Sequence, residues 1–326
     1  MNKKIAIVGT AILCLGMVAV SPFAFRRFAQ AKTPDSGSSW MTALSDDKPL
    51  SLISMPGSHD SGSIHSIADV AGICQDLTID EQLRAGVRFF DIRLRAANDN
   101  LVVCHGYVDQ GQTFKQIRAS FKSFLEANPG EGLIVSIKRE QDDSNSSKSF
   151  PILLAEQMAE DSFWDLTNEL PHRLGDIRGK AILLRRFSGS EFGVNASDNW
   201  ADPGEASNAN TFSINVASGV LRVQDHYKLN SVEDKKAEFK ALVDEAASYN
   251  SVVWAAEALL GKEKWFVNYS SGYLVDSFPP TYSLSVAPEM NDYIKTAIQG
   301  VSNTGILVLD FVTPELCQRI YEVNAR

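Results

Sequence analysis

Two histidines stand directly after short apolar segments, with small residues around them. His59 and Asp60 lie side by side in the turn Pro56–Gly62, and His105 follows the apolar segment Leu101–Cys104 and precedes a glycine. Small residues at such positions let a ligand approach the backbone closely. Two histidines can act as general base and general acid around one reacting centre. The pattern therefore predicts acid–base chemistry that uses both imidazoles.

Charged side chains end or follow several other apolar segments. A charge at the end of a buried strand is costly unless a function needs it. Arginine and lysine there would stabilise a phosphate, and aspartates could hold the imidazoles in the required tautomer. The combined set predicts acid–base cleavage of a phosphodiester. Its charged members besides Asp60 are Arg93, Lys138, Arg186, Asp225 and Asp310.

The elements that must position these side chains alternate between strands and helices. Strand-like segments are expected near residues 50–55, 87–93, 101–104, 132–138, 181–186, 219–224, 265–269 and 305–310. This alternation is typical of a (β/α)8 barrel, whose active sites gather at the carboxyl ends of the strands. Only seven residues separate Arg93 from Leu101, too few for a crossover helix. The prediction is an α/β fold, a distorted single-domain (β/α)8 TIM barrel with an irregular connection between its second and third strands. Two separate α/β domains are the alternative.

Two local signals bear on the neighbourhood of the site. Thr78 and Glu81 form a capping box, which predicts a short helix ending at Gly86. Residues 188–219 are rich in Gly, Ser, Asn and Asp, and they predict a long loop region of the kind that borders a site.

The amino terminus has the pattern of an export signal over residues 1–31. Lys3 and Lys4 precede the apolar stretch Ile5–Val20, and a small-x-small cleavage site ends at Ala31. This stretch is shorter than the ~20 residues that span a bilayer. A cleaved signal peptide and a secreted, extracellular protein are therefore expected, with an uncleaved signal anchor as the alternative. Residues 32–45 predict a flexible linker and residues 46–326 the barrel domain.

Net charge and cysteine content limit which binding partners, disulfides and metal sites are expected. The net charge is −9 and no run of Lys or Arg exceeds a pair, so nucleic-acid binding is not expected. Cys74, Cys104 and Cys317 allow at most one disulfide. Cys74 and Cys104 either pair in an oxidising compartment or remain buried thiols. No Cys/His spacing resembles a zinc site, and neither a metal nor another cofactor is expected.

Six segments resemble, in order, the motifs of bacterial phosphatidylinositol-specific phospholipases C. They are Pro56–Gly62, Phe89–Arg93, Val103–Gly106, Ser136–Glu140, Leu184–Gly189 and Val223–Lys228. Weaker matches cover residues 268–272 and 291–295. The resemblance spans residues 45–320, nearly all of the expected exported chain.

The resemblance implies cleavage of phosphatidylinositol to diacylglycerol and 1D-myo-inositol 1,2-cyclic phosphate. His59 would be the general base, paired with Asp310, and His105 the general acid, paired with Asp60. Arg93 would bind the phosphate in place of the calcium ion of metal-dependent relatives. Lys138, Arg186 and Asp225 would bind inositol hydroxyls, with Tyr227 beneath the ring. The implied partners are a phosphatidylinositol or glycosylphosphatidylinositol head group and a transient membrane contact, made by a monomer.

There are two alternative functions, and one feature of the chain differs from the family. A glycerophosphodiester phosphodiesterase or sphingomyelinase-D-like enzyme would need a His-Arg-Gly and a Glu-Asn-Thr segment, and the chain has neither. A catalytically inactive lipid- or glycan-binding barrel would not need the full acid–base set. The rim segments 63–68 and 273–278 contain no tryptophan, which together with the negative net charge predicts weak membrane binding.

Overall fold

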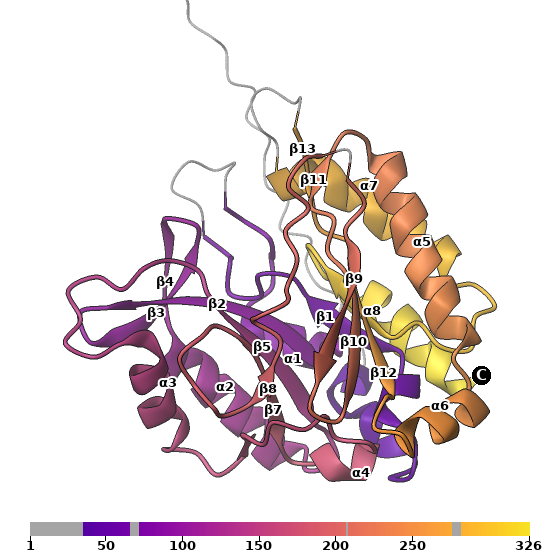
Figure 1. Cartoon of the computed structure of the whole chain (residues 1–326), viewed down its shortest axis with the longest axis horizontal. Coiled ribbons are helices and arrows are strands. Elements are labelled where there is room, and N and C mark those ends of the chain that lie inside the picture. Colours follow the sequence, from indigo (N-terminus) through magenta and orange to yellow (C-terminus); the bar gives the residue numbers. More distant parts are fainter. Residues whose placement is uncertain (1–34, 66–71, 207, 276–281) are drawn as a thin grey trace, which may run out of the picture. The chain divides into compact units, whose positions relative to one another are not determined.

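A mostly parallel sheet curls around an interior cluster of apolar side chains, with helices on its outer face (Figure 1). The structure is a computed structural model that describes residues 35–65, 72–206, 208–275 and 282–326. These residues belong to one compact unit, Pro34–Arg326, which favours the single domain over the two-domain alternative. The predicted signal peptide lies outside the described residues. In the part of the chain that is described, no helix is long and apolar enough to cross a membrane.

The strands and helices of the described chain follow in sequence order. The strands are β1 (Met55–Ser58), β2 (Phe89–Ala97), β3 (Asn100–His105), β4 (Val108–Thr113), β5 (Leu133–Arg139), β6 (Trp164–Asp165), β7 (Ala181–Arg186), β8 (Val194–Asn195), β9 (Thr211–Val216), β10 (Gly219–Gln224), β11 (Lys228–Leu229), β12 (Lys264–Tyr269), β13 (Tyr273–Leu274) and β14 (Ile306–Leu309). The α-helices are α1 (Ile79–Ala85), α2 (Phe114–Ala127), α3 (Phe150–Met158), α4 (Leu174–Ile177), α5 (Val232–Ser248), α6 (Ser251–Ala258), α7 (Tyr282–Ala297) and α8 (Pro314–Tyr321). Short 3-10 helices cover Asp35–Ser39, Met41–Ala43, Leu50–Leu52 and Glu322–Ala325.

The barrel sheet is parallel at its centre and open on one side. Strands β7, β5, β2, β1, β14, β12 and β10 lie side by side and parallel. Strand β8 extends the β7 edge, and β9 extends the β10 edge in antiparallel orientation. Among the described strands, no backbone pairing joins these two edges. The predicted barrel class is confirmed, and the ring of hydrogen bonds is incomplete.

The irregular connection after β2 is confirmed, and it is a hairpin. Segment 101–104, expected as the third barrel strand, instead pairs antiparallel with β2, so this expectation was wrong. Ala97 and Asn100 are paired, and the two residues between them, Asn98 and Asp99, both have positive φ angles of 51° and 57°. Two such residues make the turn that best matches the twist of a hairpin. Because Asn and Asp tolerate this conformation, the chain reverses here rather than entering a crossover helix.

Helix α1 begins and ends where the capping signals predict. The Thr78 side chain accepts from the Glu81 amide, the Glu81 side chain accepts from the Thr78 amide, and Gly86 ends the helix at φ 112°. The long loop predicted over 188–219 is interrupted by β8 and by β9, which pairs along its whole length with β10. The loop prediction was therefore wrong for β9, although its apolar residues Phe212, Ile214 and Val216 alternate with polar ones as in a half-buried strand.

Alternation along the strands separates two apolar clusters. In β2, Phe89 points into the barrel interior with Met55 and Val267, whereas Phe90 points outward with Phe121 of α2. Both phenylalanines are fully buried. Successive strand side chains face opposite sides of a sheet, so strands covered on both faces are apolar throughout. The same alternation continues to the end of β2, where it directs charged residues inward.

A buried ion pair joins β2 to the start of β5. The Arg88 guanidinium donates to Glu131 through Nε at 2.9 Å and Nη2 at 2.8 Å, and both side chains are fully buried. Arg88 also donates to the carbonyls of Leu83 and Val87. A buried charge pair of this kind is stable only while its remaining donors and acceptors are satisfied.

The chain before the barrel supplies those remaining partners. The Gly37 carbonyl accepts from Arg88, and the Thr42 amide and hydroxyl donate to Glu131. Trp40 is buried and donates to a carbonyl at the end of α1. The expectation of a flexible linker over 32–45 was therefore wrong from Gly37 onward, because the buried ion pair fixes this segment against the barrel.

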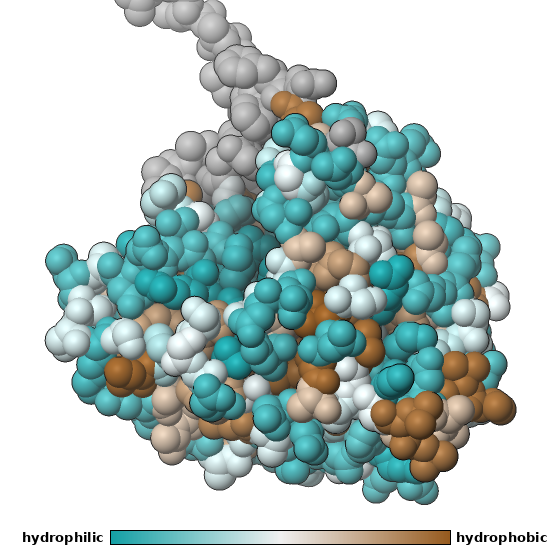
Figure 2. All heavy atoms as spheres, in the orientation of Figure 1, coloured by the Kyte–Doolittle hydropathy of each residue, from teal (hydrophilic) through white to brown (hydrophobic). Residues whose placement is uncertain are grey.

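Exposed apolar side chains gather over α6 and the turn that follows it. Figure 2 shows them as a group of brown spheres at the lower right. Val252, Leu259 and Leu260 are 77%, 89% and 69% exposed, and none of the α6 side chains is fully buried. Helix α6 and the turn after it precede the start of β12, so this patch lies at the amino-terminal end of the barrel strands.

We predict that Glu131→Gln strongly lowers the free energy of unfolding. The substitution keeps the side-chain volume but leaves the Arg88 charge buried without its counter-ion, which typically costs about 3–5 kcal/mol. Urea denaturation measures the loss. The matched control is Glu156→Gln, which removes an exposed partner of Lys148 and should cost at most about 1 kcal/mol. Equal losses in the two variants would contradict a structural role for the buried pair.

Candidate active site

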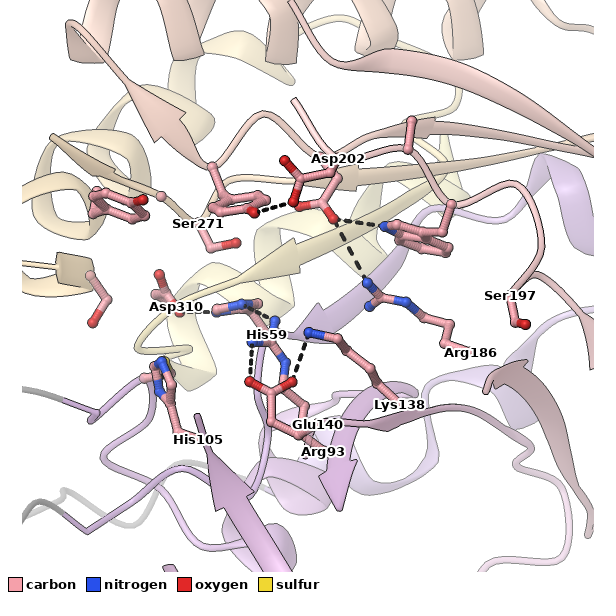
Figure 3. Close-up of a pocket in the computed structure, with 18 residues that line it drawn as sticks. His59, Arg93, His105, Lys138, Glu140, Arg186, Ser197, Asp202, Ser271 and Asp310 are labelled. Carbon is pink, nitrogen blue, oxygen red and sulfur yellow. Dashed lines mark hydrogen bonds and ion pairs between the residues drawn. The ribbon is translucent and has the colours of Figure 1, made fainter. Parts of the chain in front are cut away.

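The carboxyl ends of the barrel strands surround a cavity of about 480 Å³. Eight of the nine predicted site residues line it, namely His59, Arg93, His105, Lys138, Arg186, Asp225, Tyr227 and Asp310. The ninth, Asp60, is fully buried next to the cavity wall. Figure 3 shows His59, Arg93, Lys138 and Glu140 together at the centre of the cavity, with Arg186 to one side and His105 to the other. The structure therefore brings all nine residues into one site.

Strand register places His59 beside Asp310. Strands β1 and β14 are parallel neighbours, with Ser58 opposite Leu309, and His59 and Asp310 are the next residues of the two strands. Nδ1 of His59 lies 2.7 Å from Oδ1 of Asp310, whose side chain is buried. A carboxylate can only accept here, so the proton is on Nδ1 and Nε2 is an acceptor. This is the tautomer that a general base needs.

The turn after β1 has an unusual backbone conformation. Asp60 has a φ of 39°, and Phe311, directly after Asp310, has a φ of 48°. Non-glycine residues at positive φ are costly and persist only where the surroundings hold them. Here the Asp60 amide donates to the side chain of Asp91, and the Ser61 amide donates to the backbone carbonyl of Asp91. The strained turn is thus fixed to the interior of β2.

Arg93 lies among the acidic groups of the site. It was expected to end its strand, but β2 continues to Ala97, and alternation along β2 places Asp91 and Arg93 on the same inward face. Nη2 of Arg93 is 2.6 Å from Nε2 of His59 and 3.2 Å from Oδ2 of Asp91. Nη1 is 3.7 Å from Asp60 and 3.8 Å from Glu140. Burial would lower the pKa of Arg93, but these carboxylates outweigh it and raise the pKa.

The β3 hairpin returns His105 to the barrel mouth. The pairing of β3 with β2 ends at Val103 and Leu94, and His105, two positions further, pairs with Val108 of β4. The histidine was expected at the end of a parallel barrel strand, and it instead reaches the mouth from the antiparallel arm of a hairpin. Nδ1 of His105 is 3.4 Å from Oδ2 of Asp60, which makes the second histidine–aspartate pair of the site.

The two groups of this second pair both favour their neutral forms. Burial, which outweighs the nearby Arg93 charge, raises the pKa of Asp60 to about 7. Burial and the Arg93 charge lower the pKa of His105 to about 4. Removing the charged form from water is what drives both shifts. Between about pH 4 and pH 7 the Asp60–His105 pair therefore holds one proton between its two members.

The polar side of the cavity carries a chain of charges and rings. Arg186 lies 3.3 Å from Asp91 and 3.9 Å from Asp225, and its guanidinium carbon is 3.7 Å from the centre of the Trp200 ring. The Trp200 indole donates to Asp225 at 2.9 Å. Such stacking fixes a planar guanidinium while its edges remain available for hydrogen bonds. Tyr227 lines the same side and donates its hydroxyl to Asp202 at 2.6 Å.

Several site residues were not predicted. Glu140 lies 2.7 Å from Lys138, and although burial would raise its pKa, Arg93 and Lys138 lower it to about 2. Its spacing of two from Lys138 at the end of a strand was the available signal, as was that of Asp91 from Arg93. Trp200 lies in the region 188–219 that was predicted to border a site, but no signal within this region distinguishes it from its neighbours.

Two groups of side chains in the described chain could hold a metal ion. They are His59, Cys74 and Asp310, and Asp60, Cys74 and His105, with the potential ligand atoms of each group within 4.8 Å of one another. Cys74, Cys104 and Cys317 are all free and buried, so the Cys74–Cys104 disulfide alternative does not apply.

The comparisons with known proteins agree with one another. Residues 47–187 match the family described as phosphatidylinositol-specific phospholipase C, X domain. The chain is 31% identical over 322 residues to the 1-phosphatidylinositol phosphodiesterase of Staphylococcus aureus (strain NCTC 8325 / PS 47), covering 93% of this chain and 92% of that one. It is 27% identical over 296 residues to the protein of the same name from Listeria monocytogenes serovar 1/2a, covering 87% and 84%.

Solved structures extend the similarity to the fold. A crystal structure of a pentafluoro-Phe variant of the Staphylococcus aureus phosphatidylinositol-specific phospholipase C has a TM-score of 0.75 at 28% identity, covering 89% of this chain and 98% of that one. The Listeria monocytogenes enzyme has a TM-score of 0.64 at 25% identity, covering 88% and 98%. On the strength of its identity to the staphylococcal protein over nearly its whole length, the chain belongs to the family of bacterial phosphatidylinositol-specific phospholipases C.

Proposed function

We propose that this protein cleaves phosphatidylinositol to diacylglycerol and 1D-myo-inositol 1,2-cyclic phosphate, as a phosphorus–oxygen lyase. One observation carries the proposal. Arg93 contacts His59 directly and lies 3.7 Å from Asp60, the partner of His105, so a cation stands between the two histidine–aspartate pairs. A phosphoryl group bound at Arg93 would have one imidazole on either side.

Each bond change then has a group to perform it. His59 accepts the proton of the inositol 2-hydroxyl at Nε2, and the freed oxygen attacks phosphorus. The bond from phosphorus to the glycerol oxygen breaks, and the Asp60–His105 pair supplies the proton that this oxygen takes. Arg93, released from Nε2 of His59, stabilises the charge on the phosphoryl oxygens. Asp310 stabilises the imidazolium form of His59 during the transfer.

The polar side of the cavity fits the proposed head group. Lys138, Arg186 and Asp225 offer donors and acceptors for inositol hydroxyls, and Tyr227 offers a ring face beneath the sugar. Glu140 and Trp200 hold Lys138 and Arg186 in place. We extend the substrate class to glycosylphosphatidylinositol head groups and place the enzyme outside the cell as a secreted monomer that touches the membrane transiently.

The product tests the proposal. Phosphorus NMR of phosphatidylinositol vesicles treated with the exported domain should show the cyclic phosphodiester before any monophosphate. A substrate methylated at the inositol 2-hydroxyl should be inert, because no oxygen can then attack. Inositol 1-phosphate or phosphatidic acid as the first product would overturn the mechanism.

The two histidines should respond differently to the leaving group. His59→Ala and His105→Ala should each lower kcat/KM by at least about 10²-fold, the usual contribution of a general acid or base. A substrate with a good leaving group needs no proton from the enzyme, so it should restore His105→Ala and leave His59→Ala impaired. Equal restoration of both variants would contradict this assignment of base and acid, and restoration of His59→Ala alone would mean that the roles are reversed.

Phosphatidylinositol and the good-leaving-group substrate should differ in how their cleavage depends on pH, because only phosphatidylinositol needs the general acid. Because the raised pKa of Asp60 is about 7, the proton of the Asp60–His105 pair is lost as the pH rises through this value. In the wild type, kcat/KM for phosphatidylinositol should fall above about pH 7, by up to about tenfold per unit. The good-leaving-group substrate should not show this fall.

Membrane binding should be weak and should depend on the mouth of the barrel. Tyr107, at the turn after His105, is 88% exposed, and tyrosine suits a membrane interface. Tyr107→Ser should lower sedimentation with phosphatidylcholine vesicles further. The control Leu259→Ser changes a side chain that is 89% exposed on α6, at the opposite end of the strands, and should have no effect. Tight, salt-sensitive binding to anionic vesicles would contradict this prediction.

A further inference from the structure

Cys74 lies in the wall of the active-site cavity, and the mechanism above gives its thiol no role. The backbone around it is fixed to the ends of two barrel strands. The Cys74 amide donates to the Ser63 carbonyl at 2.9 Å, and its carbonyl accepts from the Phe311 amide at 2.7 Å. The neighbouring Gln75 side chain donates to the carbonyls of His59 and Leu309. The thiol is therefore held at a fixed place beside both histidines.

The separation of the donor atoms is that of a tetrahedral metal site. Sγ of Cys74 is 3.6 Å from Nδ1 of His105, and Nδ1 is 3.4 Å from Oδ2 of Asp60. Zinc binds sulfur at about 2.3 Å and nitrogen or oxygen at about 2.0–2.2 Å, so its ligand atoms lie about 3.3–3.7 Å apart. In contrast, Nδ1 of His59 and Oδ1 of Asp310 are 2.7 Å apart, which is a hydrogen-bond distance.

The carboxylate of Asp60 lacks the hydrogen-bond partners that a buried acceptor needs. Asp60 is fully buried, and among the residues that the structure describes neither of its side-chain oxygens has a hydrogen-bond partner. Its neighbours His105 and Arg93 approach only to 3.4 and 3.7 Å. Buried polar atoms left unpaired are uncommon and costly. A bound cation would satisfy them.

We propose that Cys74, His105 and Asp60 form an inhibitory site for zinc or a similar thiophilic divalent cation. Thiolate, imidazole and carboxylate are the ligands that zinc prefers, and three protein ligands leave one position open. On binding, the Cys74 thiol and the Asp60–His105 pair each give their proton to solvent, the ion loses water molecules, and one bond forms to each of the three ligand atoms. The thiolate and the carboxylate cancel the charge of the ion, so Arg93 faces a neutral centre. Calcium prefers oxygen ligands and should not bind.

Occupation of this site would remove the general acid. The ion takes the nitrogen of His105 and the oxygen of Asp60 between which the pair holds its proton. Departure of the glycerol oxygen would then lose its proton donor, a loss of about 10²–10⁴-fold at saturation. This consequence rests on the proposed function, whereas the metal site rests on the geometry alone.

Cobalt(II) and zinc titrations of the whole exported domain test the site. With cobalt, the wild type should show a thiolate-to-metal charge-transfer band in the near ultraviolet that saturates at one ion per chain. With zinc, phosphatidylinositol cleavage should be inhibited, and calcium at the same concentrations should have no effect. Cys74→Ala should abolish the band and raise the inhibitory zinc concentration at least tenfold. Cys74→Ser keeps the side-chain shape and should behave in the same way.

The matched control is Cys317→Ala, which removes a buried thiol of α8 and should keep both the band and the zinc sensitivity. A wild type without the band, or a Cys74→Ala variant as sensitive to zinc as the wild type, would overturn the proposal. Because the cobalt band does not depend on turnover, it decides the metal site even if phosphatidylinositol is not the substrate. The cyclic product, in turn, tests the proposed function without any added metal.

Discussion

The charge of Arg93 is the interaction on which the arrangement of the site depends. Its guanidinium bonds directly to His59 and Asp91 and lies within 4 Å of Asp60 and Glu140. Without this cation, Asp60 would lose its nearest guanidinium, and Asp91 and Glu140 would depend on Arg186 and Lys138 alone to oppose their repulsion. Arg93 in turn needs them, because a buried guanidinium is unstable alone. The site is thus one mutually dependent cluster, and it forms only when β1, β2 and β5 have all reached their final register.

The two histidine–aspartate pairs have different environments, and this difference separates their roles. His59 and Asp310 share a short hydrogen bond, which supports an imidazolium when one forms. His105 and Asp60 are further apart and lie where burial penalises both charges. The His59–Asp310 pair suits a proton acceptor, because its short hydrogen bond stabilises the imidazolium. The His105–Asp60 pair suits a proton donor, because burial disfavours both of its charged forms. Environment rather than residue type assigns the base and the acid.

Much of the site could be predicted because its residues interrupt apolar runs. His59, Asp310 and Lys138 each follow or end a buried strand, where a polar residue is conspicuous in one sequence. Asp91 and Glu140 were not singled out, because their only signal is a spacing of two from Arg93 and Lys138, which places them on the same side of their strands. The place of His105 was predicted for the wrong reason, because a hairpin and a barrel strand have the same local pattern. The hairpin turn at Asn98–Asp99 and the short connection were the signals that favoured the hairpin.

Because the sheet is open on one side, head-group preference and folding can change separately, whereas in a closed barrel they would be coupled. Between the β7 and β10 edges, part of the cavity wall is the loop that carries Ser197, Trp200 and Asp202. A strand in this position could not change length without disturbing the ladders on both sides of it. A loop can gain or lose residues while the sheet remains intact. Selection on head-group preference can therefore act on this wall almost independently of selection on folding, and laboratory evolution aimed at new inositol derivatives should begin there.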